Sequence, residues 1–442
     1  MSKVKRKGPM QTIDLRSSDA ATAVSKLRSK QSIPPKATRI VQRILKEVEA
    51  QGDAALLSYT SKLDGAELTS GTLKVTPQEI SVAYLKVSKE QVSAIRFAKQ
   101  RVEQFERAVM DSVKPPQINE DGVKIKQKIV PIDSVGCYVP GGRASYPSSL
   151  LMTVIPAKVA GVKRIVVTSP PTKDGAIPPL LLVAADICGV NEFYKAGGAQ
   201  AIAALAYGTD TVKSVEKIVG PGNIYVTAAK QLVSSVVATD LPAGPSEILI
   251  LADSSANPNF VVRDLLSQAE HGPDSICGVA TESPDIALKV SDLLSKLLNK
   301  VERQEIVDAS LSKGGFIALC KNMNQVVEFA NLFAPEHLEV MTAEPARTAE
   351  QITSAGLVLL GQYTPVAASD YCVGTNHVLP TGGSARRSSG LSSLDFVRRM
   401  DIVDCSKQGL EALRGAASLL ASSEGLSNHA SAIDERFKGE ST

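Results

Sequence analysis

The residues of this chain that are best suited to chemistry are its four histidines, each of which lies near another polar side chain. They are His271, His337, His377 and His429. Taken alone, a histidine is more often a satisfied core or surface residue than a ligand or a base, although imidazole serves both roles near neutral pH. Four such neighbourhoods in one sequence favour a chemical role for some of them.

Gln268 and His271 close the amphipathic run NPNFVVRDLLSQAEHG, which stops at a glycine. Residues three apart share one face of a helix, so both side chains point the same way at its end. Histidine nitrogens combined with carboxylate or amide oxygens suit Zn²⁺, and Mn²⁺ or Co²⁺ could enter the same geometry. The sequence has no H-E-x-x-H motif, which argues against the familiar zinc peptidases.

A carboxylate and an imidazole are adjacent at Glu336 and His337 in FAPEHLEV. Two potential bases side by side indicate either a general acid–base pair or a solvated helix end, and the spacing favours neither. The remaining two histidines also follow an acidic residue at short distance, in the segments SDYCVGTNHVLP and EGLSNH.

Four glycine-rich turns, GCYVPGG, KAGGAQ, VGPGN and PAGPSE, come at the ends of expected strands. Backbone amides in such turns, followed by a helix N-terminus, bind anions and nucleotides. Ligands of α/β sheets collect at the carboxyl ends of the strands. No G-x-G-x-x-G follows a strand in the standard arrangement, so the pattern alone predicts dinucleotide binding only weakly.

Composition and charge restrict the class of protein. The 442 residues suffice for two or three domains, and a hydrophobic content of 43% is ordinary for a globular protein. A net charge of +3 is too small to indicate nucleic acid or an anionic membrane as the main partner. No apolar run approaches the roughly 18 residues of a transmembrane helix, and none follows the basic start as a secretory signal would. Six scattered cysteines without a C-x-x-C pair suit a reducing compartment, so we expect a cytoplasmic protein.

The first third of the chain is predicted to be helical. Residues 38–65 carry apolar side chains at helical spacing and end at a glycine. Residues 88–110 open with Ser88 and Gln91, a capping-box pattern. The residues that we expect on the buried face of this second helix are Val92, Ile95, Val102 and Phe105.

The rest of the chain alternates between strands and helices. KRIVVTSPP, VNEFYKAGG and VEKIVGPG read as strands, and helical segments lie between them. The pattern recurs in SEILILAD, SICGVAT, GGFIALC, HLEVMT and GLVLLG. This alternation predicts two α/β units with parallel sheets covered on both faces. Residues 406–437 then form an amphipathic helical segment beyond the last strand.

Eight segments form an ordered set of motifs along the chain. They are GCYVPGGRASYPSSLLMTVIPAKVAGV, AGGAQAIAALAYGT, KIVGPGNIYVTAAK, PAGPSEILILAD, LLSQAEHG, LFAPEHLEV, SDYCVGTNHVLPT and EGLSNHASAI. This set closely resembles the histidinol dehydrogenase family, and the likeness runs from about Thr12 to Phe437. The resemblance implies a zinc-dependent cytosolic enzyme that oxidises L-histidinol to L-histidine with two NAD, through an aldehyde that is not released.

The resemblance also implies roles for individual residues. The implied ligands of one zinc ion per subunit are Gln268, His271, Asp370 and His429. The implied acid–base pair is Glu336 and His337. The implied substrate contacts, besides the zinc ligands and His337, are Ser246, His377 and Glu424. The implied NAD contacts are Tyr138, Gln200 and Asn223. Two features depart from the family pattern: Cys372 stands where a smaller residue is usual, and LVSSVVATDLP lacks an expected aromatic residue and glycine.

The resemblance implies an α/β fold with two incomplete Rossmann-like domains, parallel-rich sheets and small helical N- and C-terminal extensions. The expected parts are an extension over residues 1–34, a catalytic and metal-binding domain over 35–138 and 246–390, an NAD-contacting domain over 139–245, and a helical tail over 391–442. The family forms an intertwined homodimer in which the tail crosses to the partner. Glu424 and His429 would then complete the neighbouring site, and a monomer would be inactive.

Three alternatives stay open from the sequence. The chain could oxidise another small alcohol, such as a sulfonated diol, although His377 and Glu424 suit a cationic amine and an imidazole. A zinc hydrolase would use Glu336 to activate water and would turn over without NAD. A non-catalytic nucleotide- or metal-binding module would tolerate replacement of Glu336 and His337.

Overall fold

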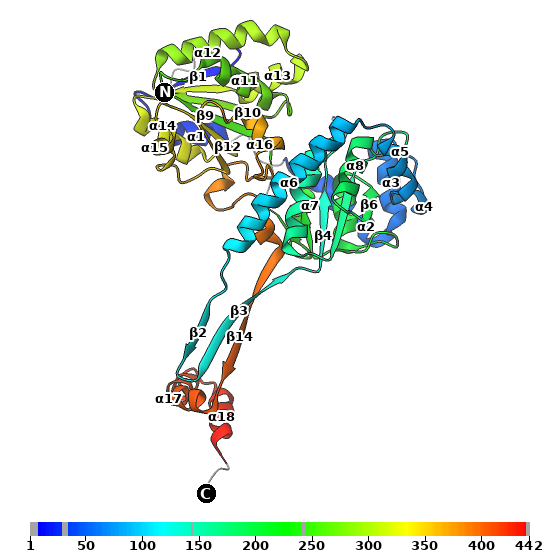
Figure 1. Cartoon of the computed structure of the whole chain (residues 1–442), viewed down its shortest axis with the longest axis vertical. Coiled ribbons are helices and arrows are strands. Elements are labelled where there is room, and N and C mark those ends of the chain that lie inside the picture. The colour runs from blue at the N-terminus through cyan, green and yellow to red at the C-terminus, as the bar shows by residue number, and fades with distance from the viewer. Residues whose placement is uncertain (1–7, 29–33, 143–144, 241–243, 439–442) are drawn as a thin grey trace.

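The structure, a computed structural model, describes residues 8–28, 34–142, 145–240 and 244–438. Two lobes, each built around a parallel sheet, lie next to each other, and a long arm projects away from them (Figure 1). This arrangement confirms the predicted α/β class with parallel-rich sheets and a helical C-terminal extension. Among the described residues, no helix has the length and apolar character needed to cross a membrane.

The first lobe contains a six-stranded parallel sheet and is called the six-stranded lobe below. Its strands, in spatial order, are β1 (Gln11–Asp14), β11 (Phe316–Leu319), β10 (Ile276–Thr281), β9 (Glu247–Ala252), β12 (His337–Met341) and β13 (Leu357–Leu360). The helices on one face are α11 (Pro258–Ala269), α12 (Pro284–Leu297) and α13 (Gln304–Gly314). Those on the other face are α1 (Ala20–Arg28) and α14 (Met323–Phe333). The central strands β9 and β10 are buried along their whole length and mostly apolar, because helices cover both faces of the sheet.

The second lobe contains a five-stranded parallel sheet and is called the five-stranded lobe. Its strands, in spatial order, are β6 (Glu192–Lys195), β5 (Arg164–Ser169), β4 (Ser134–Tyr138), β7 (Lys217–Val219) and β8 (Ala238–Thr239). The helices on one face are α2 (Pro35–Gln51), α3 (Asp53–Asp64), α9 (Gly198–Tyr207) and α10 (Ile224–Val233). Those on the other are α5 (Pro77–Tyr84), α6 (Lys89–Ser112), α7 (Pro147–Ala160) and α8 (Pro179–Ile187).

The contacts of residues 35–138 differ from the predicted division, which grouped them with the catalytic domain. Helices α2 and α3 share a core with α9 and α10, and α6 packs along α7, so the helices of this segment belong to the five-stranded lobe. The predicted N-terminal extension instead supplies β1, which pairs in parallel with β11 of the six-stranded lobe. Amphipathic spacing shows that a helix buries one face, but it does not show which sheet covers that face.

Two details of the helical prediction were also tested. Residues 38–65 form two helices rather than one, because Gly52 between α2 and α3 adopts φ 55°. Ser88 and Gln91 form the expected capping box at the start of α6. Ile95 and Val102 are buried as predicted, but the prediction for Phe105 was wrong, since 43% of it is exposed.

The arm is a three-stranded antiparallel sheet with two helices at its tip (Figure 1). Its strands are β2 (Gln117–Glu120), β3 (Val123–Pro131) and β14 (Val397–Cys405), and its helices are α17 (Lys407–Ser423) and α18 (Ser427–Asp434). Several large apolar side chains of the arm are exposed in the single chain. They include Ile118, Ile125, Met400, Val403, Leu413, Leu419, Leu420 and Leu426. Exposed apolar side chains gathered on one projecting element are typical of surfaces that another molecule covers.

Candidate active site

The predicted residues of the six-stranded lobe meet at the amino ends of its strands. His337 is the first residue of β12, and Ser246 directly precedes β9. Gln268 lies in the last turn of α11, which leads from β9 back to the start of β10. Asp370 lies in the short helix α16 (Val366–Tyr371), which packs against α11. The predicted NAD contacts lie at or just beyond the carboxyl ends of β4, β6 and β7 in the other lobe.

Glu336 and His337 are both buried, and the backbone of Glu247 holds both. The Glu247 N–H donates to Glu336 Oε2 at 2.7 Å, and His337 Nδ1 lies 3.2 Å from the carbonyl oxygen of Glu247. Since a carbonyl can only accept, the proton is on Nδ1, and Nε2 is the basic nitrogen of the neutral ring. Among the described residues, Nε2 has no hydrogen-bond partner. The pair therefore has the anchoring expected of a general base.

The two side chains also change each other's ionisation. Burial raises the pKa of the Glu336 carboxyl. Burial is the largest single influence and would lower the pKa of His337, but the charge of Glu336, with Oε2 3.6 Å from Nδ1, combines with the other contacts of the ring to raise that pKa to about 9. Asp370 acts in the same direction, with Oδ1 3.8 Å from Nε2. The pair consequently retains a proton at neutral pH.

Gln268 is 1% exposed, and neither polar atom of its side-chain amide has a hydrogen-bond partner among the described residues. A buried amide without a partner is costly, so such an atom marks a place where a ligand binds. His271, one turn further on, is exposed, and its Nδ1 lies 3.2 Å from the carbonyl oxygen of Ser267. That contact leaves Nε2 as the ring nitrogen available to a ligand.

His377 connects this site to the five-stranded lobe. Its Nδ1 donates to the carbonyl oxygen of Asp370 at 2.8 Å, and its Nε2 lies 3.2 Å from the hydroxyl of Ser149 in α7. Burial lowers the pKa of His377, and the charge and carbonyl oxygen of Asp370 offset only part of that effect. In the neutral ring Nε2 accepts from the Ser149 hydroxyl. A substrate contact at His377 would therefore have to replace or extend that hydrogen bond.

Two predicted site residues, Glu424 and His429, lie apart from the others. Both are exposed, and both lie at the junction of α17 and α18, at the tip of the arm (Figure 1). Within the described part of one chain, no group of three or more histidine, cysteine, aspartate and glutamate side chains is placed to hold a metal ion. A single chain thus brings Gln268, His271 and Asp370 to one region but leaves His429 outside it.

The three predicted NAD contacts follow neighbouring strands, but their side chains already have partners. The buried Tyr138 hydroxyl accepts from the Gly198 N–H at 3.2 Å, and burial raises the pKa of Tyr138 to about 12. Gln200 is fully buried, and its Nε2 donates to Asp64 Oδ2 at 3.3 Å. Asn223 Oδ1 caps α10 by accepting two backbone N–H groups. A cofactor contact by Asn223 would therefore use its Nδ2 group.

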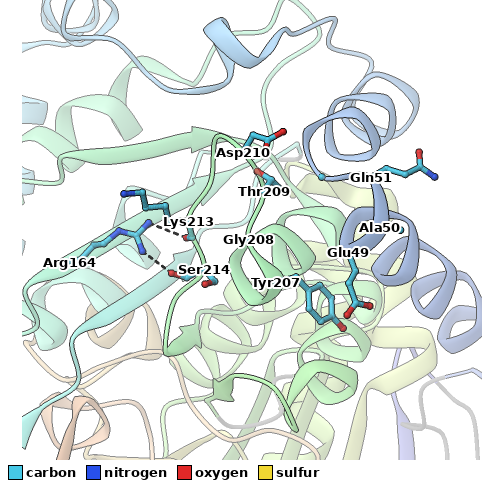
Figure 2. A pocket seen from close by; sticks show the side chains of 11 residues that line it. Glu49, Ala50, Gln51, Arg164, Tyr207, Gly208, Thr209, Asp210, Lys213 and Ser214 are labelled. Atoms are coloured by element: carbon cyan, nitrogen blue, oxygen red, sulfur yellow. Dashed lines mark hydrogen bonds between the residues drawn. The ribbon is translucent and has the colours of Figure 1, made fainter.

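A surface hollow of 840 Å³ lies elsewhere, beside the amino end of β5 (Figure 2). None of the predicted site residues lines it. Its arginine, Arg164, donates to Glu192 and to the backbone carbonyls of Lys213 and Ser214, so that cation is already used within the fold.

Sequence reasoning missed three residues that shape the site, namely Ser149, Glu247 and Glu339. Glu339 is buried in β12, accepts from the Val366 N–H at the start of α16 at 2.7 Å, and shares a hydrogen bond with Asp264. Burial raises its pKa. One signal was present: Glu339 is two residues from His337, which puts both on one face of a strand, and a carboxylate inside an apolar strand needs a partner.

Known proteins of one family resemble this chain over most of its length. The family model described as histidinol dehydrogenase matches residues 27–437. The histidinol dehydrogenase of Methanothermobacter thermautotrophicus is 46% identical over 398 residues, which is 90% of this chain and 93% of that protein. That of Methanocaldococcus jannaschii is also 46% identical over 398 residues, 90% of this chain and 92% of that protein.

A solved structure is similar over almost the whole length. The crystal structure of histidinol dehydrogenase from Elizabethkingia anophelis has a TM-score of 0.91 at 36% identity and covers 98% of this chain and 99% of that one. The sequence match spans both lobes and the arm, and so includes every residue of the site described above. This chain belongs to the histidinol dehydrogenase family.

Proposed function

We propose that this chain oxidises L-histidinol to L-histidine in two NAD-dependent steps, the last of L-histidine biosynthesis, with the intermediate L-histidinal kept in the site. The observation that carries the proposal is the buried Glu336–His337 pair, anchored by Glu247 and facing Asp370. Family membership supports the reaction and the use of NAD. The proposal includes a cytoplasmic location, which the six free cysteines support.

The proposal includes one zinc ion per subunit, held by Gln268, His271, Asp370 and His429. The donor set of two imidazoles, a carboxylate and an amide oxygen suits Zn²⁺. The fit is supported by Gln268, whose buried amide has no partner among the described residues. When bound, zinc would fix the amine and imidazole of histidinol and polarise its oxygen.

His429 reaches such a site only if a second copy of the chain supplies it. The arm carries His429 and Glu424 away from the lobes of its own chain and exposes apolar side chains along its length (Figure 1). We infer a homodimer in which each arm lies on the other subunit. His429 would complete the partner's metal site, and Glu424 would bind the partner's substrate. Both active sites would then be shared.

In the first step His337 would take the hydroxyl proton of histidinol as a hydride leaves the same carbon. This needs the neutral ring, so the proton that the pair retains at neutral pH has to leave first; in that ring the Glu247 carbonyl keeps the proton on Nδ1, and Nε2 can accept. NAD would supply the hydride acceptor in both steps, next to Tyr138, Gln200 and Asn223. Ser246, His377 and Glu424 would hold the polar groups of the substrate. Much of the rate acceleration comes from holding the reacting carbon between the base and the hydride acceptor.

In the second step water must add to the aldehyde before another hydride can leave. Glu336 is the base proposed for that water. Its raised pKa brings the carboxyl closer to neutral pH, where a general base works best. The overall change converts one alcohol, one water and two NAD into a carboxylate, two NADH and three protons.

The reaction is tested by measuring NADH formed per histidinol consumed, with and without a strong chelator. We expect a ratio of two and loss of turnover after chelation, restored by added zinc. A ratio of one would show that the aldehyde is not oxidised further. Turnover of an ester or amide without NAD would favour the hydrolase alternative instead.

A further inference from the structure

Arg28, the last residue of α1, reaches the turn that carries the catalytic pair. Its side chain is 15% exposed, and its guanidinium lies 3.8 Å from the centre of the Phe333 ring. Nη2 donates to the carbonyl oxygens of Phe333 at 2.5 Å and Ala334 at 3.3 Å. Two carbonyls that would otherwise lack a helical partner at the end of α14 are thereby satisfied.

The turn that Arg28 contacts is strained. Ala334 adopts φ 49°, in the left-handed region that is unfavourable for a residue with a Cβ. Only Pro335 separates Ala334 from Glu336. Such a conformation persists where the surroundings hold it in place, and strain of this kind collects at functional sites.

The same guanidinium holds the other side of the catalytic pair. Nη1 forms an ion pair with Glu247 Oε1, which also accepts from the Gly382 N–H at 3.0 Å. The Glu247 side chain is fully buried. The backbone of Glu247 binds Glu336 Oε2 through its N–H and His337 Nδ1 through its carbonyl. One arginine thus connects the turn before Glu336 to the residue that orients both catalytic side chains.

We propose that Arg28 is a positioning residue for the Glu336–His337 pair, an inference that rests on the proposed function. Arg28 touches the turn and Glu247 and does not itself contact the reacting groups. Without it, the turn and the start of β9 can shift relative to each other. A shift of about 1 Å at such a pair costs about 10²-fold in rate, while substrate and NAD still bind to their own contacts.

The test compares Arg28→Ala, Arg28→Lys and the control Arg16→Ala in the full-length protein. Arg16 lies in the same N-terminal segment but pairs with Asp14 at the surface, with half of its side chain exposed. We expect kcat for histidinol to fall about 100-fold in Arg28→Ala, with both KM values within threefold of wild type. The kcat of Arg28→Lys should lie between those of wild type and Arg28→Ala, because one ammonium group cannot bind Glu247 and both carbonyls at once.

Two further measurements separate positioning from loss of fold. Thermal unfolding gives the folded fraction of each variant at the assay temperature, and kcat is divided by it. Added guanidinium, at concentrations that leave wild type unchanged, should partly restore kcat of Arg28→Ala by filling the vacated space. Restored activity is not expected from a variant that is merely unstable.

The inference is overturned if kcat per folded molecule of both Arg28 variants stays within twofold of the Arg16→Ala control, or if only KM changes. If wild type and Arg16→Ala fail to oxidise histidinol, the proposed function fails first, and the two failures are thereby told apart. If Arg28→Ala does not fold, Arg28→Lys alone decides between the two results.

Discussion

Gln268 is the residue whose surroundings most directly support the proposed zinc site. Both polar atoms of its amide are buried without a partner among the described residues, although buried amides are normally hydrogen-bonded. His337 Nε2 is in the same condition. The proposed substrate and zinc ion would satisfy both groups, which the described residues leave without a hydrogen bond.

The first prediction concerns the separate roles proposed for the two bases, His337 in the alcohol step and Glu336 in the aldehyde step. Glu336→Gln keeps an oxygen for the Glu247 N–H but removes the base. We expect oxidation of histidinal to slow by roughly 10²- to 10⁴-fold and oxidation of histidinol to slow much less. Stopped-flow NADH traces started with each compound measure the two halves. Equal losses in both would contradict the assignment.

Asp64 provides a prediction about stability. Burial raises its pKa to about 6, with Gln200 as its hydrogen-bond donor. Between pH 4 and 6 the folded state therefore holds more protons than the unfolded state, and the free energy of unfolding falls as pH rises through this window. Above pH 6 the full free-energy cost of burying the charged Asp64 carboxylate is present, and below pH 4 this cost is absent.

Asp64→Asn removes that penalty. We expect the variant to be more stable than wild type by about 1–2 kcal/mol at pH 8, after allowing for partial solvent screening, and to match it at pH 4. Urea unfolding at both pH values measures the difference. The same gain at both would mean that the charge of Asp64 is not its cause.

At the scale of elements, the site depends on how strand ends meet helix ends. The last turn of α11, the start of β12 and the short α16 lie together because parallel strands linked by helices return each helix to the same edge of the sheet. The carboxyl ends of β4, β6 and β7 place the proposed NAD contacts on the other sheet. Ser149 in α7 of the five-stranded lobe is hydrogen-bonded to His377 and so connects the two parts of the site.

The turn after β7 gives a prediction at this scale. Gly220 adopts φ 118°, and a Cβ there would lie 2.1 Å from the Tyr138 carbonyl oxygen. Lys230 and Asp240, a buried ion pair, hold its carbonyl and its N–H. Alanine at this position must push the turn away from β4 and so misplace the proposed NAD contacts.

We expect Gly220→Ala to raise the KM for NAD about tenfold and to lower the free energy of unfolding by about 2 kcal/mol. Gly361→Ala is the matched control, because Gly361 has φ 80° but open space around it. The control should lose stability without a change in the KM for NAD. If both variants bind NAD like wild type, this turn does not position the cofactor.

The sequence predicted strands β5–β7 and β9–β13 of the two parallel sheets because they are apolar runs bounded by glycine and proline, but it did not name β1, β4 or β8 as strands. It missed β3 and β14, whose alternation of lysine, arginine and aspartate with apolar residues reads as a solvated segment. Arg28 was also missed, since its partners Phe333, Ala334 and Glu247 lie more than 200 residues away. Contacts at that range depend on sheet order, which local spacing does not encode.

At the scale of the whole molecule, the arm is the element that a single chain does not explain. Its tip holds Glu424 and His429, and its exposed leucines would be an aggregation risk in a monomer. In the proposed two-fold dimer the same patch would be buried on both subunits, and two tips would reach two sites. The lobes would then supply the base and three donors, and the arm of the partner would supply the rest.

Complementation between two inactive variants tests this central claim most directly. His271→Asn damages a site through the lobes, and His429→Ala damages it through the arm. Each variant alone should be inactive and should retain little zinc. If the arms are exchanged, unfolding and refolding the two together at equal amounts should yield mixed dimers with one intact site. Random mixing then predicts about one quarter of wild-type activity. If both residues serve a site within one chain, mixed dimers contain no intact site, and the absence of any recovered activity would contradict the account.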